Sequence, residues 1–303
     1  MGPTAAGKTD LAVRLVQSLP FEIISVDSAM VYRGMDIGTA KPDAETRQRA
    51  PHRLIDVRDP EHTYSAGDFV RDARAEMARI REAGRVPLLV GGTMMYFRAL
   101  THGLAALPPA DRELRAALDD EARRFGWPAL HRRLARLDPA AAARIEPNDG
   151  QRIQRALEVY LKSGRPLSEW QAQDAPGAAG AAYLKIGLLP EPRSELNRRI
   201  ARRFDVMLRE GLVEEVARLR QRPGLERGRP AMRAVGYRQI WDYLEGRTTL
   251  EEAIRDAVTA TRRLAKRQMT WLRSERGLIC HNTLEGDPFA AIFTRMSERM
   301  SRV

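Results

Sequence analysis

The first nine residues carry the feature that most constrains how this chain can fold. The stretch from Gly2 to Thr9, GPTAAGKT, matches the pattern G-x-x-x-x-G-K-[ST] at every fixed position. Glycines in this pattern let the backbone curl so that several N–H groups converge on phosphate oxygens, at the positive end of the next helix. The lysine adds a positive charge, and the final hydroxyl can ligate Mg²⁺. We therefore predict a diphosphate-binding loop made of Gly2, Pro3, Thr4, Ala5, Ala6, Gly7, Lys8 and Thr9, with Thr9 as the ligand of a Mg²⁺ cofactor.

A phosphate-binding loop of this kind connects a buried strand to a helix. Residues 11–16 (LAVRLV) predict the helix, but only Met1 precedes Gly2. A sheet without its first strand should be destabilised. Either that strand lies outside this sequence, or the start of the chain has been assigned wrongly.

Short apolar runs alternate with helical patterns up to about residue 105, which predicts a parallel sheet covered by helices. Residues 21–26 (FEIISV) indicate a buried strand, residues 53–57 a weaker one, and residues 86–90 a third. Between the last two, residues 66–83 indicate a helix that is closed by Gly84. The predicted fold class is α/β, with a P-loop NTPase-like core built on a parallel sheet.

The sequence changes character near residues 107–109. Residues 111–171 show a helical pattern with many arginines and no strand signal, and Asn148 or Asp149 can cap a helix that ends at Gly164. Residues 172–182 indicate a connector, and residues 183–189 a further strand. We therefore divide the chain into a first part of the core (1–107), an all-helical insertion domain (108–178) and a second, mostly helical part of the core (179–303).

Two more helices are predicted after residue 190. One starts at Ser194, and the last long helix starts at a capping box formed by Thr249 and Glu252. We expect the apolar stripes of three helices to face the core. These stripes are Ile153, Leu157, Tyr160 and Leu161; Leu196, Ile200, Phe204, Met207 and Leu208; and Ile254, Ala257, Val258, Leu264 and Leu272.

The charge of the chain favours a polyanionic partner. Lys and Arg number 51 against 40 Asp and Glu, for a net charge of +11. Such an excess favours nucleic acid, because each neutralised phosphate releases condensed counterions; a genome that encodes its surface cations as arginine would give the same balance. Apolar runs are too short to span a bilayer, no signal peptide is evident, and Cys280 is the only cysteine. We expect a cytoplasmic monomer without disulfides or a cysteine-based metal site.

Two polar residues follow predicted strands at the edge where a parallel sheet binds its ligands. Asp27 comes directly after the strand that ends at Val26, so it should face the bound diphosphate. It can act as a general base, as a second-sphere magnesium partner or merely as a helix cap. The third strand ends in Gly91-Gly92-Thr93, where many ATPases carry a magnesium-binding Asp. This difference argues against routine ATP hydrolysis and leaves open whether ATP binds.

Five stretches, in order along the chain, resemble the tRNA dimethylallyltransferase family. They are GPTAAGKT at 2–9, DSAMVYRGMDIGTAKP at 27–42, GGTMMY at 91–96, QRIQRALE at 151–158 and AVGYRQ at 234–239. The resemblance extends to about residue 272, and its sixteen-residue stretch is far more specific than the phosphate-binding loop. Some eukaryotic members carry a C-terminal zinc finger that this sequence lacks, so the resemblance is to the bacterial type.

The resemblance implies transfer of a dimethylallyl group from dimethylallyl diphosphate to the exocyclic amine of the adenosine 3′-adjacent to the anticodon in tRNA. Asp27 is the candidate for the base that accepts the amine proton, which typically accelerates such a step by about 10²–10⁴-fold. The loop amides, Lys8 and Mg²⁺ on Thr9 would stabilise the leaving diphosphate. By analogy with the family Thr93 helps to place the acceptor, and Arg203 is a further candidate for the diphosphate site.

The acceptor base must leave its stacked anticodon loop to reach such a pocket, so contacts to the RNA are needed elsewhere. Cations spaced along one face of the last long helix are typical of a track for the phosphate backbone. The tRNA-contacting candidates are Asp27, Ser28, Ala29, Met30, Thr93, Arg115, Gln151, Arg152, Ile153, Gln154, Arg155, Met232, Arg233, Ala234, Val235, Gly236, Tyr237, Arg262, Lys266 and Arg267.

Other functions are compatible with part of this pattern. A P-loop kinase acting on a small molecule or nucleoside would use Lys8, Thr9 and Asp27, but it leaves the basic insertion without a role. A nucleotide-switched RNA-binding protein would need a guanine-specificity motif such as Asn-Lys-x-Asp, and none occurs. An enzyme that prenylates free adenine nucleotides remains a close alternative, against which the arginines of the insertion favour tRNA.

Overall fold

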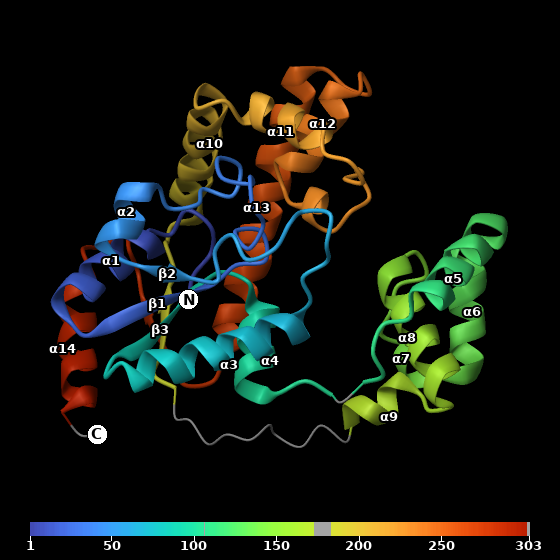
Figure 1. Ribbon diagram of the computed structural model, residues 1–303, viewed down its shortest axis with the longest axis horizontal. Coiled ribbons are helices and arrows are strands. Elements are labelled where there is room, and N and C mark those ends of the chain that lie inside the picture. The colour runs from blue at the N-terminus through green and yellow to red at the C-terminus, as the bar shows by residue number, and fades with distance from the viewer. Residues whose placement is uncertain (106, 173–182, 302–303) are drawn as a thin grey trace. The chain divides into compact units, whose positions relative to one another are not determined.

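The computed structural model describes residues 1–105, 107–172 and 183–301 (Figure 1). The chain divides into two compact units, one of Met1–Ala99 with Tyr183–Val303 and the other of Leu100–Ala182. The first holds two parallel sheets with their covering helices, and the second is helical. This arrangement confirms the predicted α/β class. The predicted connector at 172–182 lies, except for Ala172, outside the described residues.

The central sheet of the first unit has three parallel strands in the order β2-β1-β3. Strand β1 (Phe21–Val26) is buried along its whole length, and it pairs with β3 (Val86–Gly91) from Phe21 opposite Val86 to Val26 opposite Gly91. Apolar runs of this kind fit a strand that is covered on both faces. The strands predicted at 21–26 and 86–90 are therefore confirmed.

The strand predicted at 53–57 is wrong. Strand β2 spans only His52–Arg53, and the chain then turns through positive φ at Leu54 (62°) and Asp56 (57°). The Asp56 carboxylate accepts hydrogen bonds from Lys41 Nζ at 2.6 Å and from Arg47 at 3.0 Å. These contacts hold residues 54–56 in a turn, although the apolar residues of this segment favour an extended conformation.

A second sheet joins β4 (Lys185–Leu188) in parallel to β5 (Leu278–His281). Met1 lies alongside β4, since its α-amino group donates to the Ile186 carbonyl at 2.7 Å and its carbonyl accepts from Leu188 N at 2.9 Å. The residue before the phosphate-binding loop therefore has strand-like pairing, although no strand precedes it within this sequence.

Helices of the first unit cover these sheets and build the wall opposite the phosphate-binding loop. Both α1 (Lys8–Ser18) and α3 (Ala66–Glu82) pack against β1 and β3, and α1 also contacts α14. Gly84, with a φ of 70°, follows α3 where the sequence predicted its end. The remaining elements are α2 (Ala44–Arg49), α4 (Met94–His102), α10 (Arg193–Arg209), α11 (Leu212–Arg220), η1 (Ala231–Arg233), α12 (Tyr237–Leu244), α13 (Leu250–Ser274) and α14 (Phe289–Met300).

The capping box at the start of α13 is confirmed, because the Thr249 hydroxyl and the Glu252 carboxylate exchange hydrogen bonds with each other's backbone N–H groups. The predicted stripe of α10 is buried except at Leu208. In α13 the stripe is only partly right. Ala257 and Leu272 are buried, but Ile254, Val258 and Leu264 are half-buried, and the core side is made by Ala253, Ala257, Ala265, Gln268, Met269 and Leu272.

The second unit is a small bundle with its own core, formed by Leu118, Leu130, Leu134, Ile153 and Leu157 among others. Its helix α8 is capped by Asp149 and ends at Gly164 in the left-handed conformation. Leu161, predicted to face the core, is exposed, and Val159 is buried instead. The helices are α5 (Arg112–Phe125), α6 (Trp127–Leu137), α7 (Pro139–Ala142), α8 (Gly150–Ser163) and α9 (Leu167–Ala172). None of the helices in the described part of the chain has the length and apolar character that a membrane span requires.

Candidate active site

The phosphate-binding loop has the backbone curvature that its sequence predicts. Ala5 and Gly7 adopt positive φ (62° and 79°), and α1 begins at Lys8 directly after them. Lys8 Nζ donates to the Pro3 carbonyl at 2.6 Å, so its side chain lies over the loop. Burial, followed by the positive charge of Arg203, lowers the pKa of Lys8 to about 8, while Asp27 opposes this shift. A lysine in such a place gains from a bound anion, which restores its charge.

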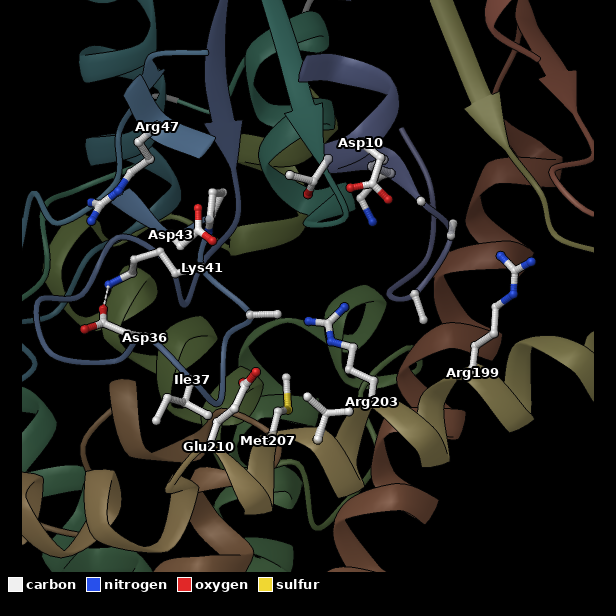
Figure 2. A pocket seen from close by; sticks show the side chains of 18 residues that line it. Asp10, Asp36, Ile37, Lys41, Asp43, Arg47, Arg199, Arg203, Met207 and Glu210 are labelled. Carbon is white, nitrogen blue, oxygen red and sulfur yellow. Dashed lines mark hydrogen bonds and ion pairs between the residues drawn. The ribbon is translucent and has the colours of Figure 1, made fainter. Parts of the chain in front are cut away.

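The loop forms one side of a pocket of about 810 Å³ (Figure 2). Across from it stand side chains of α10, among them Arg199, Arg203 and Met207, and a third side is made by the segment from Asp36 to Asp43. The lining combines cations with the apolar side chains of Ile37, Val206 and Met207, and it also includes the carboxylates Asp10, Asp36, Asp43 and Glu210. A ligand that carries a diphosphate and a short hydrocarbon fits this combination of charge and apolar surface.

Arg203 points from α10 into the pocket (Figure 2). Burial lowers its pKa, an effect that the charge of Asp27 partly offsets. Within the described part of the chain, Arg203 donates a long hydrogen bond of 3.4 Å to the Thr39 carbonyl. Arg199, one turn earlier on α10, lines the same pocket. Sequence reasoning missed Arg199, although its i, i+4 spacing from Arg203 places both on one helix face.

Asp27 and Thr93 lie on adjacent turns at the carboxyl ends of β1 and β3. Asp27 Oδ1 accepts hydrogen bonds from Ala29 N at 2.8 Å and from Met30 N at 3.2 Å. The Thr93 hydroxyl accepts from Ser28 N at 3.1 Å, and its own N–H donates to the Val26 carbonyl at 3.2 Å. Asp27 thus caps its own turn with one oxygen, while Oδ2 accepts no hydrogen bond from the described residues. A capping role and a role in proton transfer are compatible here.

A buried carboxylate on α11 holds the segment that forms the third side of the pocket. Glu215 Oε2 accepts from Asp36 N and Ile37 N at 3.0 and 2.8 Å, and Oε1 accepts from Gly38 N at 3.2 Å and the Tyr237 hydroxyl at 2.5 Å. A Cβ at Gly38 would lie 2.5 Å from the Tyr237 ring, so only glycine fits. Residues 36–38 and Tyr237, which belong to two of the stretches that resemble the family, are therefore packed around the Glu215 carboxylate.

The side chain of Gln268, on α13, joins the phosphate-binding loop to the turn that carries Thr93. Its Oε1 accepts from Thr4 N at 3.0 Å, and its Nε2 donates to the Gly92 carbonyl at 2.7 Å. Sequence reasoning missed both Gln268 and Glu215. Each is a polar residue on the core side of an amphipathic helix, which is a pattern that the sequence shows. The neighbouring residues in the sequence do not identify the groups that these side chains bind.

The cations predicted on α13 lie mainly on the exposed side of the helix. Lys266 and Arg267 are exposed, whereas Arg262 is half-buried and its Nε has no hydrogen-bond partner among the described residues. Arg233, in η1, is also exposed. In contrast, Met232 and Tyr237 are fully buried. The side chains of Met232 and Tyr237 therefore belong to the core of this structure, and contact between their stretch and RNA stays a prediction.

In the helical unit, several predicted RNA contacts serve the fold of the unit itself. Glu158 is fully buried, and its carboxylate accepts two hydrogen bonds from Arg115, at 2.8 and 2.9 Å, and one from Arg155 at 2.6 Å. Gln154 donates to Asp119 at 2.7 Å. Ile153 is fully buried and packs in the core of the unit, and its predicted contact with RNA stays a prediction. Gln151 and Arg152 remain exposed at the start of α8.

A divalent ion at the phosphate-binding loop would have few protein ligands. Among the described residues no group of three or more His, Cys, Asp or Glu side chains could hold a metal. Thr9 and Asp10, at the start of α1, line the pocket. This donor set fits Mg²⁺, which keeps several waters and is commonly held by one or two protein oxygens together with substrate phosphates.

Proteins with similar sequences are transferases that act on tRNA. A sequence model of the IPP transferase family matches residues 30–275. The tRNA dimethylallyltransferase of Alkalilimnicola ehrlichii is 60% identical over 291 residues, covering 94% of this chain and 90% of that protein, and that of Thiobacillus denitrificans is 59% identical over 287 residues, covering 95% and 91%.

Solved structures show the same likeness. The full-length tRNA isopentenylpyrophosphate transferase of Bacillus halodurans superposes with a TM-score of 0.73 at 39% identity, over 99% of this chain and 95% of that one. A eukaryotic dimethylallyltransferase acting on tRNA superposes with a TM-score of 0.75 at 25% identity, over 94% and 73%. With a phosphate-binding loop, a pocket of matching chemistry and relatives of this similarity over nearly its whole length, the chain belongs to the IPP transferase family.

Proposed function

We propose that this chain transfers the dimethylallyl group of dimethylallyl diphosphate to the exocyclic amine of the adenosine 3′-adjacent to the anticodon in tRNA, and releases diphosphate. The observation that carries the proposal is the pocket in which the phosphate-binding loop faces Arg203 and Arg199. Asp27 is not part of the pocket lining, but its charge acts on both Lys8 and Arg203, and Thr93 hydrogen-bonds the residue that follows Asp27. A cationic cradle beside a carboxylate with one available oxygen provides both halves of a transfer to an amine.

The diphosphate half of the reaction belongs to the loop and α10. The loop amides, Lys8 and Arg203 bind the diphosphate and stabilise the negative charge that develops when the bond between carbon and oxygen breaks. Thr9 would hold the divalent ion, Mg²⁺ in this proposal, which supplies further charge neutralisation on the phosphate oxygens. Ile37, Val206 and Met207 provide apolar surface for the dimethylallyl group.

The acceptor half belongs to Asp27 and Thr93. The amine lone pair forms the new bond to the carbon that carries the diphosphate, and the electron pair of the broken bond leaves with the diphosphate oxygen. The nitrogen then loses a proton, which Asp27 Oδ2 accepts, because Oδ1 already accepts two backbone N–H groups. Thr93, fixed by its hydrogen bond to Ser28 N, orients the base beside Asp27.

The tRNA is held by exposed cations outside the pocket. Lys266 and Arg267 on α13, together with Arg233, bind the phosphate backbone in the first unit, and the half-buried Arg262 of α13 contributes from the edge of this surface. In the helical unit, which we propose as a tRNA-contacting insertion, exposed Gln151 and Arg152 at the start of α8 meet the RNA. Arg115, Gln154 and Arg155 support that surface from within the unit.

The test is an incubation of the protein with an unmodified tRNA transcript, dimethylallyl diphosphate labelled in its hydrocarbon, and Mg²⁺. After digestion to nucleosides, label in the adenosine 3′ of the anticodon supports the proposal, and a transcript with guanosine at that position is the matched control. Label in free adenine nucleotides but not in tRNA would overturn the acceptor assignment. Transfer of phosphate from γ-labelled ATP without any prenyl transfer would identify a kinase instead.

A further inference from the structure

The interior of the first unit contains a side chain that links the two halves of the proposed reaction. Gln268 is 9% exposed and lies on the buried side of α13. Its carboxamide binds Thr4 N in the phosphate-binding loop and the Gly92 carbonyl at the end of β3. These two partners lie 264 and 176 residues away in the sequence, so the contact exists only in the folded chain.

From Gly92 the connection continues to the acceptor side. Thr93 is the next residue, and its hydroxyl accepts from Ser28 N, which follows Asp27. Three hydrogen bonds, joined by the peptide links Gly92–Thr93 and Asp27–Ser28, therefore connect the loop proposed to bind the leaving group with the turn that carries the proposed base.

The packing around this connection leaves no room for adjustment. A Cβ added at Gly92 would lie 2.6 Å from Gln268 Nε2 and 3.0 Å from the Gly2 carbonyl. A Cβ at Gly91 would lie 2.1 Å from the Val26 carbonyl. A side chain at either glycine would therefore collide with its neighbours, so the turn that carries Thr93 packs closely against strand β1 and the Gln268 amide.

The chemistry of the contact requires a carboxamide. The side chain presents one acceptor to an N–H and one donor to a carbonyl, and glutamine offers both at any physiological pH, whereas glutamate offers both only when it is protonated. An ionised glutamate would place an oxygen against the Gly92 carbonyl, and methionine would leave both backbone groups without their partner.

We propose that Gln268 is a positioning residue that sets the separation between the bound diphosphate and the acceptor amine, without contacting either substrate. It acts on the rate of the transfer step rather than on substrate affinity, since misplacement of reacting atoms by about 1 Å can cost on the order of 10²-fold in rate. The inference rests on the proposed roles of the phosphate-binding loop and Asp27.

The experiment compares wild type with Gln268→Glu and Gln268→Met in the complete chain, using labelled transfer to tRNA to obtain kcat and both KM values. The matched control is Gln221→Glu, at an exposed position after α11. We expect kcat to fall about 10- to 100-fold in both Gln268 variants, with each KM within about threefold of wild type and the control unchanged.

A second readout separates positioning from general damage. A protonated glutamate carries an acceptor and a donor like glutamine, so the kcat deficit of Gln268→Glu should shrink as the pH is lowered from 8.5 to 6, while that of Gln268→Met should not. Should Gln268→Met fail to fold, the pH profile of Gln268→Glu decides alone. Unchanged kcat, or raised KM at unchanged kcat, or a deficit in Gln268→Glu that does not shrink would overturn the proposal. A wild-type protein without prenyl transfer would instead contradict the proposed function itself.

Discussion

Replacement of Glu215 by alanine should loosen the segment that forms the third side of the pocket. The Glu215 carboxylate is 3% exposed and accepts hydrogen bonds from Asp36 N, Ile37 N, Gly38 N and the Tyr237 hydroxyl. Burial, and then the negative charge of Glu215, raises the pKa of Tyr237 well above its ordinary value, so the hydroxyl remains a donor at any physiological pH.

The expected loss follows from these four bonds. A hydrogen bond to a charged group contributes about 1.5–3 kcal/mol. Simple addition overestimates the total, because the three loop amides can rebind water once the carboxylate is gone. The Tyr237 hydroxyl is fully buried and cannot rebind water in this way. We therefore expect Glu215→Ala to lower the free energy of unfolding by about 3–5 kcal/mol, and Glu215→Gln by about 1–2 kcal/mol, because its carboxamide keeps one acceptor oxygen.

Hydrogen exchange of the peptide that covers residues 34–42 measures this directly. Protection of the amides of Asp36, Ile37 and Gly38 should fall in the order wild type, Glu215→Gln, Glu215→Ala, and the KM for dimethylallyl diphosphate should rise in the same order. Equal protection in wild type and Glu215→Ala, with unchanged stability, would refute the account of Glu215 as the residue that holds this wall.

Three further results are expected. Diphosphate binding should charge Lys8, whose pKa is about 8 in the ligand-free protein, so affinity should be nearly full at pH 7 and fall about tenfold between pH 7 and 9. Lys8→Arg, which does not titrate there, should show no such fall beyond that of the ligand, and an identical fall would exclude Lys8. Charge reversal at Lys266 and Arg267 should weaken tRNA binding and reduce the salt slope by about 0.7–0.9 per lost phosphate contact, whereas Arg299→Glu on α14 should leave it unchanged; equal slopes would show that α13 is only solvated. Arg115→Ala should destabilise the helical unit by about 2–3 kcal/mol, because buried Glu158 loses a bidentate partner. Arg152→Ala should instead weaken tRNA binding without altering thermal stability. The opposite pattern would contradict a structural role for Arg115 and an RNA-binding role for Arg152.

Local patterns in the sequence predict the parts of the structure that local chemistry determines. The phosphate-binding loop, the two long strands of the central sheet, the capping box of α13 and the juxtaposition of Asp27 with Thr93 all follow from periodicity, turn residues and the geometry of parallel sheets.

What sequence reasoning missed depends on contacts distant in the chain. Asp56 leaves the extended conformation because Lys41 and Arg47 bind its carboxylate. Strand β5 is four half-exposed or exposed residues and is specified by its pairing with β4. Helix α14 had a detectable signal, since Phe289, Ile292, Phe293 and Met296 follow a helical period and pack against α1. The hydrogen bond from the buried Tyr237 hydroxyl to Glu215 was also missed, because the two residues lie 22 positions apart and no local pattern pairs them.

The most direct test of the central claim is the single-turnover transfer of labelled dimethylallyl from preformed enzyme–diphosphate complex to tRNA, in wild type and Asp27→Asn. Asparagine keeps an oxygen that can accept from Ala29 N and Met30 N, so the turn is preserved, but its nitrogen cannot accept a proton. The account predicts rapid label transfer by wild type, a rate lower by about 10²–10⁴-fold in Asp27→Asn, and tRNA affinity within about tenfold. Transfer by Asp27→Asn at a rate near that of wild type would contradict it.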